Sequence, residues 1–264
     1  MPKGTRGGKR VTATIAPQAA PAPQPTPAPQ PQPIQNQAPS PQNTPVTPNA
    51  VSALTKMSDS QLTALYNQSQ RVDMPNHLKD ASDATQKFVY AAGINEKPLV
   101  LDDAEFDKFR RDNNIPKSQQ MARSTNGASY TVNGTTMTLT PQQTTDLIKY
   151  GSLNYIGGKH GGQVYGAGTY FAMNGGRNTG YGGTTMVAVL NPKTAKPIDR
   201  ATLRSQTARW SQSHPQFANA VGSFKNSNAS IYALVQGYNV ITDGMDDYHN
   251  VIDRSAIVIR KNNI

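Results

Sequence analysis

Apolar residues recur at helical spacing in three segments of the first half of the chain. SDSQLTALYNQSQ begins with Ser58 as a candidate N-cap and places apolar residues three and four positions apart. DASDATQKFVYAAG ends at Gly93, a residue type that often terminates helices. DDAEFDKFRRDNN begins with acids and ends with basic residues, the order that the helix dipole favours. The pattern therefore predicts a helical segment over residues 57–115.

From residue 116 onward the pattern changes to short apolar runs separated by polar turns. QMARSTNG reads as a short strand that leads into a turn, and YTVNGTTMTLT reads as a hairpin around its Asn-Gly pair. Thr140 is expected to cap a helix that ends before Gly151. TTMVAVLNP predicts a buried strand, a helix is expected around 200–222, and the chain ends in a strand. Strands mixed irregularly with helices predict the α+β class.

The first 56 residues show neither the helical spacing of apolar residues nor the short apolar runs typical of strands. They hold 13 of the 20 prolines and no acidic residue, in runs such as PAPQPTPAPQPQP. Because they have almost no apolar surface to bury, they cannot offset the entropy that ordering would cost. We therefore expect a disordered, basic, Pro/Gln-rich tail over 1–56, a helical segment over 57–115 and an α+β domain over 116–264.

The net charge of +10 is divided between this tail and the rest of the chain. A basic arm is suited to a polyanion, which makes nucleic acid a candidate partner, and a solubilising end is the alternative interpretation. Half of the net charge comes from the tail's five basic side chains: Lys3, Arg6, Lys9, Arg10 and Lys56.

Composition and spacing exclude or disfavour several other classes of protein. The chain has no cysteine, which excludes a thiol nucleophile, a zinc-thiolate site and a disulfide scaffold. Its four histidines lack zinc-site spacing, and neither a G-x-S-x-G elbow nor a P-loop occurs, so no metal site is expected. The basic start leads into proline rather than into the apolar stretch of a signal peptide. No window approaches the ~18 consecutive apolar residues of a membrane span. We expect a soluble protein of a cytoplasm, without a membrane partner.

Three features of the domain over 116–264 are candidates for chemistry. Arg123, at the end of a short strand, can hold a phosphate through two parallel hydrogen bonds, and a surface arginine is the structural alternative. YGAGTYFA, residues 165–172, combines glycines that permit close backbone approach with aromatic rings, a composition that ordinary sheets also use. Three late aspartates share one loop, where turn formation would also explain them: Asp243, Asp246 and Asp247.

Taken in this order, the three features resemble the ADP-ribosyltransferase family over roughly residues 118–262. Arg123 in ARST resembles the arginine that the family carries on an early strand. YGAGTYFAMN resembles the G-x-G-x-Y-F-A segment of the poly(ADP-ribose) polymerase branch, and GYNVITDGMDDYHNVIDRSAIVIR resembles the family's closing stretch with its R-x-A turn. The resemblance implies a split β-sandwich with flanking helices, preceded here by the small helical segment and the tail.

The resemblance also implies an activity, the transfer of a single ADP-ribose from NAD, consumed as a substrate, to a host macromolecule such as a protein. In such a reaction the nicotinamide–ribose bond breaks through an oxocarbenium-like state. On the family pattern Arg123 would hold a phosphate or ribose, Tyr170 would stack on nicotinamide, and Asp247 would stabilise the developing cation. The resemblance assigns further NAD contacts to Ser124, Gly166, Gly168, Thr169, Phe171 and Tyr181.

Two positions depart from the family pattern. Ser124 stands where members usually have glycine, and Tyr248, His249 or Asn250 stands where a glutamate is expected. Polymer synthesis in the family depends on that glutamate, so single transfer is expected rather than chain extension. The missing glutamate also favours an alternative, a catalytically inactive protein of this fold with a structural or interaction role in a phage particle. The tail, small helical region and C-terminal domain together are similar to bacteriophage-encoded members, some of which are packaged in the virion and delivered into the host cytoplasm.

Overall fold

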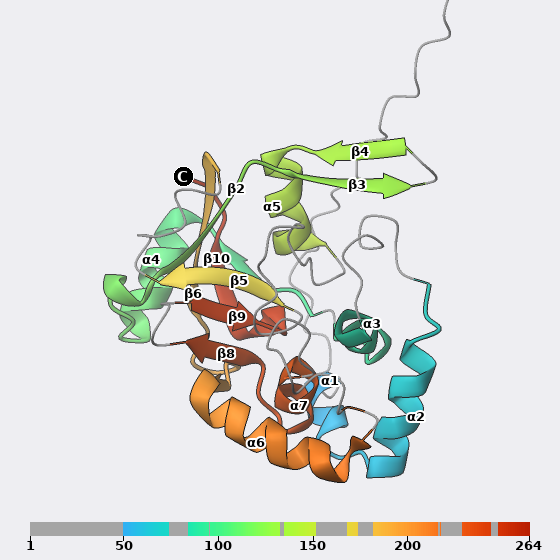
Figure 1. Cartoon of the computed structure of the whole chain (residues 1–264). Helices are drawn as coiled ribbons and strands as arrows, with labels where there is room; N and C mark the ends of the chain where they lie inside the picture. Colours follow the sequence, from blue (N-terminus) through green and yellow to red (C-terminus); the bar gives the residue numbers. More distant parts are fainter. Residues whose placement is uncertain are drawn as a thin grey trace, which may run out of the picture. The chain divides into compact units, whose positions relative to one another are not determined.

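A computed structural model describes most of the chain that follows the tail (Figure 1). The chain divides into two units, Met1–Pro45 and Val46–Ile264, and every described residue belongs to the second. Helices and strands are mixed along this unit, which confirms the expected α+β class, whereas the finer expectation of a split β-sandwich stays a prediction. The described residues are 50–73, 84–94, 96–132, 135–151, 168–173, 182–215, 217, 229–243 and 248–264.

A mixed sheet of eight strands organises the described part of Val46–Ile264, in the order β1-β10-β6-β2-β5-β9-β8-β7. Neighbouring strands run antiparallel except in the pairs β1–β10 and β7–β8. A separate antiparallel hairpin, β3 and β4, confirms the hairpin expected in this region. The strands are β1 Leu99–Leu101, β2 Met121–Thr125, β3 Ala128–Val132, β4 Thr135–Leu139, β5 Thr169–Met173, β6 Thr184–Leu190, β7 Pro197–Asp199, β8 Val240–Asp243, β9 Tyr248–Val251 and β10 Ile257–Arg260.

The helices begin where the local sequence supplies a cap. Ser58, Asp102 and Thr140 each accept a hydrogen bond from the backbone N–H three residues on, and the side chain of that residue accepts in return from the N-cap backbone N–H, which forms a capping box. Two of these caps, Ser58 and Thr140, confirm the sequence prediction. The helices are α1 Ala50–Leu54, α2 Asp59–Ser69, α3 Ala84–Ala91, α4 Asp103–Asp112, α5 Pro141–Tyr150, α6 Arg200–Ser213 and α7 Ala229–Val235, with short 3₁₀ turns at Lys117–Gln119 and Arg254–Ala256.

Alternation along the strands divides the side chains of the sheet between two faces. One face, here called the α5 face, packs Phe171, Met186 and Val251 in a cluster with Ile148 of α5. The other, here called the α6 face, is covered at one end by α4 and at the other by α6 and α7 (Figure 1). Helices therefore pack on both faces of the sheet. In the strand order, β2, β5 and β9 lie in the middle, between the strands next to α4 and those next to α6 and α7.

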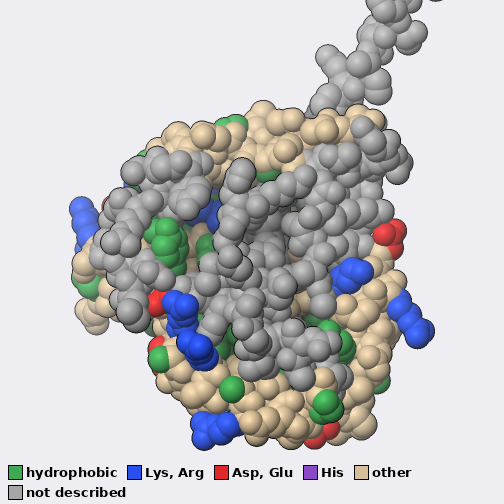
Figure 2. Space-filling view, viewed as in Figure 1, with side chains coloured by type: hydrophobic (Ala, Val, Ile, Leu, Met, Phe, Trp, Pro, Cys, Tyr) green, Lys and Arg blue, Asp and Glu red, His purple; other side chains and the backbone are tan. Residues whose placement is uncertain are grey.

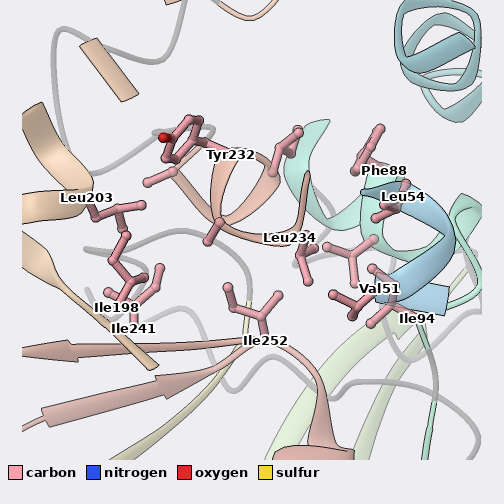
Figure 3. Packing of buried hydrophobic residues seen from close by; sticks show 14 of the residues in the cluster. Val51, Leu54, Phe88, Ile94, Ile198, Leu203, Tyr232, Leu234, Ile241 and Ile252 are labelled. Carbon is pink, nitrogen blue, oxygen red and sulfur yellow. The ribbon is translucent and has the colours of Figure 1, made fainter. Parts of the chain in front are cut away.

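The helices before residue 115 share a core with the later part of the chain. Val51 and Leu54 of α1, together with Phe88 of α3, lie in one cluster with Leu234 of α7 and Ile252 (Figure 3). Strand β1 joins the sheet as the parallel neighbour of β10. The residues that the sequence divided into 57–115 and 116–264 thus lie in one compact unit.

The first helix corrects the expected length of the disordered tail. Ala50–Leu54 is helical, although the sequence analysis placed it within the tail over 1–56. Val51 and Leu54 are only 6% and 1% exposed, because their spacing of three residues turns both side chains toward α7 and α3. Residues 1–49 lie outside the described part of the chain.

Helix α5 is fixed over the sheet by a buried arginine. Arg254 donates from Nη1 to the carbonyl of Ile148 at 2.8 Å and from Nη2 to the carbonyl of Gly151 at 2.8 Å. Carbonyls at a helix C-terminus lack intrahelical partners, and a cation there also complements the helix dipole. Burial lowers the pKa of Arg254 to about 10, so the side chain stays charged at neutral pH. The arginine of the expected R-x-A turn is therefore a helix cap in this structure.

Two truncations test where the folded unit begins. A chain that starts at Val46 should melt at nearly the temperature of the full chain, because it keeps every described residue. A chain that starts at Met57 should lose about 3 kcal/mol or more, since it leaves the sites of Val51 and Leu54 empty. For a unit of this size that loss lowers the melting temperature by roughly 10 °C, which calorimetry or circular dichroism can measure. Equal melting temperatures for the two truncated chains would contradict the packing of α1.

Candidate active site

The strands that carry the first two motifs separate after a short contact. Met121 pairs with Met173 and Ala122 with Ala172, and these are the only register pairs between β2 and β5. Beyond them β2 stays paired with β6 through its last residue, and β5 stays paired with β9 through its first. The hydrogen-bond ladder of the described sheet thus forks between β2 and β5.

Arg123 lies at this fork and bridges the two strands. It is the first residue of β2 past the last pair with β5, and it is half-buried. Its Nη1 donates to the carbonyl oxygen of Tyr170 on β5 at 3.0 Å. A strand released by its neighbour leaves backbone groups that need other partners, and the guanidinium supplies one of them. The structure therefore places the Arg123 guanidinium against the backbone of Tyr170, two of the three residues to which the sequence analysis gave catalytic roles. By strand alternation their side chains leave opposite faces, Arg123 with Met121 on the α5 face and the Tyr170 ring on the α6 face.

Neighbouring residues of β5 point to opposite faces and have different surroundings. Tyr170 is half-buried and packs at the edge of the cluster formed by the helices of the α6 face. Phe171 is fully buried in the cluster of the α5 face, and Thr169 is also fully buried. The side chains of Thr169 and Phe171 are thus core residues, and the NAD contacts expected of these two positions stay a prediction.

Ser124 holds β2 to β6. Its hydroxyl lies 2.7 Å from the hydroxyl of Thr185, its register partner on β6, and the residue is only 7% exposed. This hydrogen bond secures the arm of the fork on which Arg123 stands. The NAD contact expected of Ser124 would have to compete with it.

Gly168 allows β5 to approach β9 closely. Its φ of +154° is a backbone conformation that residues with a side chain rarely adopt. A Cβ atom at this position would overlap the side chain of Asn250, which is fully buried on β9. The glycine of the G-x-G-x-Y-F-A segment therefore has a steric reason in this fold. Gly166, Tyr181 and Asp247, also expected at the site, lie outside the described residues.

A matched pair of glycine substitutions tests this close approach. Gly168→Ala should cost about 2 kcal/mol in the free energy of unfolding, because the methyl group meets Asn250 and backbone of β9. Gly183→Ala is the control, since a Cβ atom there would have nothing within 4 Å, and it should change stability by less than about 0.5 kcal/mol. Urea unfolding of the two variants measures the difference. Similar stabilities would show that β5 does not need the glycine.

Asp243 is the one late aspartate of the shared loop whose surroundings the structure describes. It is the last residue of β8, it is 3% exposed, and its carboxylate pairs with Arg200 of α6 at 2.7 Å. Register pairs Asp243 with Tyr248 on β9 and Tyr248 with Ala172 on β5, which puts this carboxylate on the same face as Tyr170. The sequence analysis placed Asp243 in a turn. Its partner Arg200 is 43 residues away in the chain, so the residues around Asp243 give no sign of the ion pair.

Strand β9 carries the three residues that occupy the family's glutamate position. Tyr248 and Asn250 lie on the α6 face with Tyr170, whereas His249 pairs with Phe171 and lies on the α5 face. The Nδ1 of His249 is buried and forms no hydrogen bond within the described part of the chain. Burial lowers the pKa of this imidazole, against a smaller opposing effect of the Tyr248 backbone, so the ring is neutral at pH 7. None of the three side chains supplies negative charge.

The described residues were also compared with the requirements of a metal site and of a membrane span. They contain no group of three or more His, Cys, Asp or Glu side chains that could hold a metal ion. In the same part of the chain, no helix is long and apolar enough to cross a membrane.

Comparisons with known proteins give no match to family models, to curated proteins or to solved structures.

Proposed function

We propose that this protein is an NAD-dependent mono-ADP-ribosyltransferase with an ADP-ribosyltransferase-like fold, which transfers ADP-ribose from NAD to a host macromolecule. The observation that carries the proposal is the contact between Arg123 and Tyr170 at the fork between β2 and β5. The two residues belong to motifs 47 positions apart, and both were assigned to one site from their sequence context. Because their side chains leave opposite faces of the sheet, a single NAD would contact both across the edge at which β2 and β5 separate.

In this proposal Arg123 holds a phosphate or the ribose of NAD. A guanidinium carries five N–H donors in a fixed plane, a geometry that suits the oxygens of a phosphate or a ribose. The bond to the Tyr170 carbonyl fixes the plane of the guanidinium before NAD arrives. Binding then costs less side-chain entropy than it would for a mobile arginine.

Tyr170 would stack on the nicotinamide ring. Its position at the edge of a helical cluster fixes the phenol ring from one side. An aromatic face held in this way can bind a planar ring at a low cost in conformational entropy. Because the Tyr170 carbonyl and Arg123 are bonded, the nicotinamide end of NAD would be oriented by the same strand that orients the arginine.

The negative charge that stabilises the oxocarbenium-like state is assigned to Asp247, with Asp243 as the second candidate. Asp243 shares the face of Tyr170, but its charge is already paired with Arg200 at 2.7 Å. Such a partner weakens the field that a carboxylate exerts on a developing cation. This pairing favours Asp247 over Asp243.

A catalytically inactive protein of the same fold, acting as a structural or interaction protein of a phage particle, is the second candidate function. One observation favours it, namely that strand β9 offers Tyr248, His249 and Asn250 where a glutamate would supply the charge. Without such a charge the fork could still bind a ligand without cleaving it. Packaging in a virion and delivery to the host cytoplasm belong to this proposal and not to the description of the fold.

Release of nicotinamide from NAD tests the proposed activity. Asp247→Asn should lower turnover about a hundredfold, because it removes the charge opposite the developing cation. Tyr170→Ala should weaken NAD binding by about 1–3 kcal/mol through the loss of one stacking ring, and Arg123→Ala should abolish measurable turnover. Arg111→Ala, an exposed arginine of α4, is the control and should leave turnover unchanged.

Melting temperatures separate loss of activity from loss of fold, since Arg123→Ala also removes the bond to Tyr170. Turnover that survives Asp247→Asn but is lost in Asp243→Asn would move the role to the buried carboxylate. A parent chain that releases no nicotinamide with a broad set of acceptors would favour the inactive protein.

A further inference from the structure

An open groove of about 860 Å³ lies between the beginning of α6 and the end of β8. Three small residues of α6 line it together with Arg200 and Arg204, namely Ala201, Ser205 and Ala208. Asp199 and Asp243 complete the lining. Small residues beside two long cationic ones leave room for a ligand close to positive charge.

The two arginines are aligned by the helix. They are four residues apart, so their side chains leave α6 on the same side, with Cβ atoms about 6 Å apart. Arg204 is exposed and the side chain of Arg200 is 31% exposed, so both can reach a ligand. Helix α6 contains three arginines and no acidic residue. In Figure 2, Lys and Arg side chains gather over the end of α6 that lies beside β8 in Figure 1.

The acidic side chains of the groove are engaged within its own wall. Asp243 is almost fully buried and accepts from Arg200 at 2.7 Å, which fixes the direction of that guanidinium. Asp199 caps α6 by accepting from the backbone N–H of Thr202 at 2.9 Å, and its bonds to Thr202 lower its pKa. Both carboxylates thus act as acceptors toward the protein, and Arg200 and Arg204 bring two positive charges to the lining of the same groove.

We propose that this groove binds a phosphate-bearing ligand, whose anionic oxygens are held by Arg200 and Arg204. Two planar guanidinium groups about one helical turn apart match the donors that successive phosphate oxygens require. Ser205, the residue after Arg204, donates its hydroxyl to the carbonyl of Thr202 at 3.0 Å, so the two guanidinium groups carry the anion binding. The ion pair with Asp243 orients Arg200 in advance, which lowers the cost of binding. The proposal goes beyond the ADP-ribosyltransferase activity and does not depend on it.

Titration of the full chain with inorganic pyrophosphate tests the groove. Trp210, the only tryptophan of the chain, lies on α6 and provides a fluorescence signal beside calorimetry. Arg204→Gln should weaken pyrophosphate binding at least tenfold, because it removes one of the two cations at an exposed position of α6. Arg209→Gln is the matched control: the same change at an exposed arginine of the same helix, away from the groove, should alter the dissociation constant less than twofold.

Arg200→Gln is a poorer first test, because it would leave the buried carboxylate of Asp243 without its partner and would destabilise the fold. No saturable binding of pyrophosphate at millimolar concentration would overturn the proposal. Equal weakening in Arg204→Gln and Arg209→Gln would overturn it too, because that result indicates a diffuse effect of charge.

Two further titrations identify the source of the phosphate once pyrophosphate binds. If Arg204→Gln weakens NAD and ADP as much as pyrophosphate, the groove holds the pyrophosphate of the dinucleotide. If pyrophosphate and ADP depend on Arg204 but NAD does not, the groove serves another phosphate-bearing ligand, such as a nucleotide acceptor. Nicotinamide release by the parent is measured separately, so its absence would count against the proposed transferase without changing the result of the pyrophosphate titration.

Discussion

The separation of β2 from β5 is the constraint on which the candidate site depends. Two antiparallel strands that stayed paired along their whole length would bond their edges to each other and leave no opening between them. Here the pairing ends after Ala122 and Ala172, and each strand keeps its other neighbour. The released carbonyl of Tyr170 needs a donor, and Arg123 provides it at 3.0 Å. One hydrogen bond thus stabilises the fork and orients the side chain proposed to bind NAD.

The two arms of the fork are made rigid by different means. On the β2 side the hydroxyl of Ser124 bonds to Thr185 of β6, and on the β5 side Gly168 permits close contact with Asn250 of β9. Behind the arms, α5 is capped by Arg254, and the helices of the α6 face enclose the ring of Tyr170 from one side. A site proposed to strain a dinucleotide needs such support, because mobile groups would lose the advantage of orientation.

The sequence predicted the local features of the fold well and the long-range ones poorly. Caps at Ser58 and Thr140 depend on residues within a turn of the helix, so composition reveals them. The helix at Ala50–Leu54 was missed because its two apolar side chains follow a proline-rich run and acquire partners only in α3 and α7. The motif around Tyr170 was recognised, but its contact with Arg123 and the burial of Phe171 follow from strand order, which a single sequence does not encode locally. The pair Arg200–Asp243, on which the groove beside α6 depends, belongs to the same class of long-range contact.

The most direct test of the NAD site is a crystal structure of the full chain with nicotinamide or NAD bound. The account predicts that the nicotinamide ring lies against Tyr170 and that Arg123 donates to the ribose or to a phosphate. A ring bound elsewhere on the protein, or crystals soaked to saturation that show no ligand at the fork between β2 and β5, would contradict it.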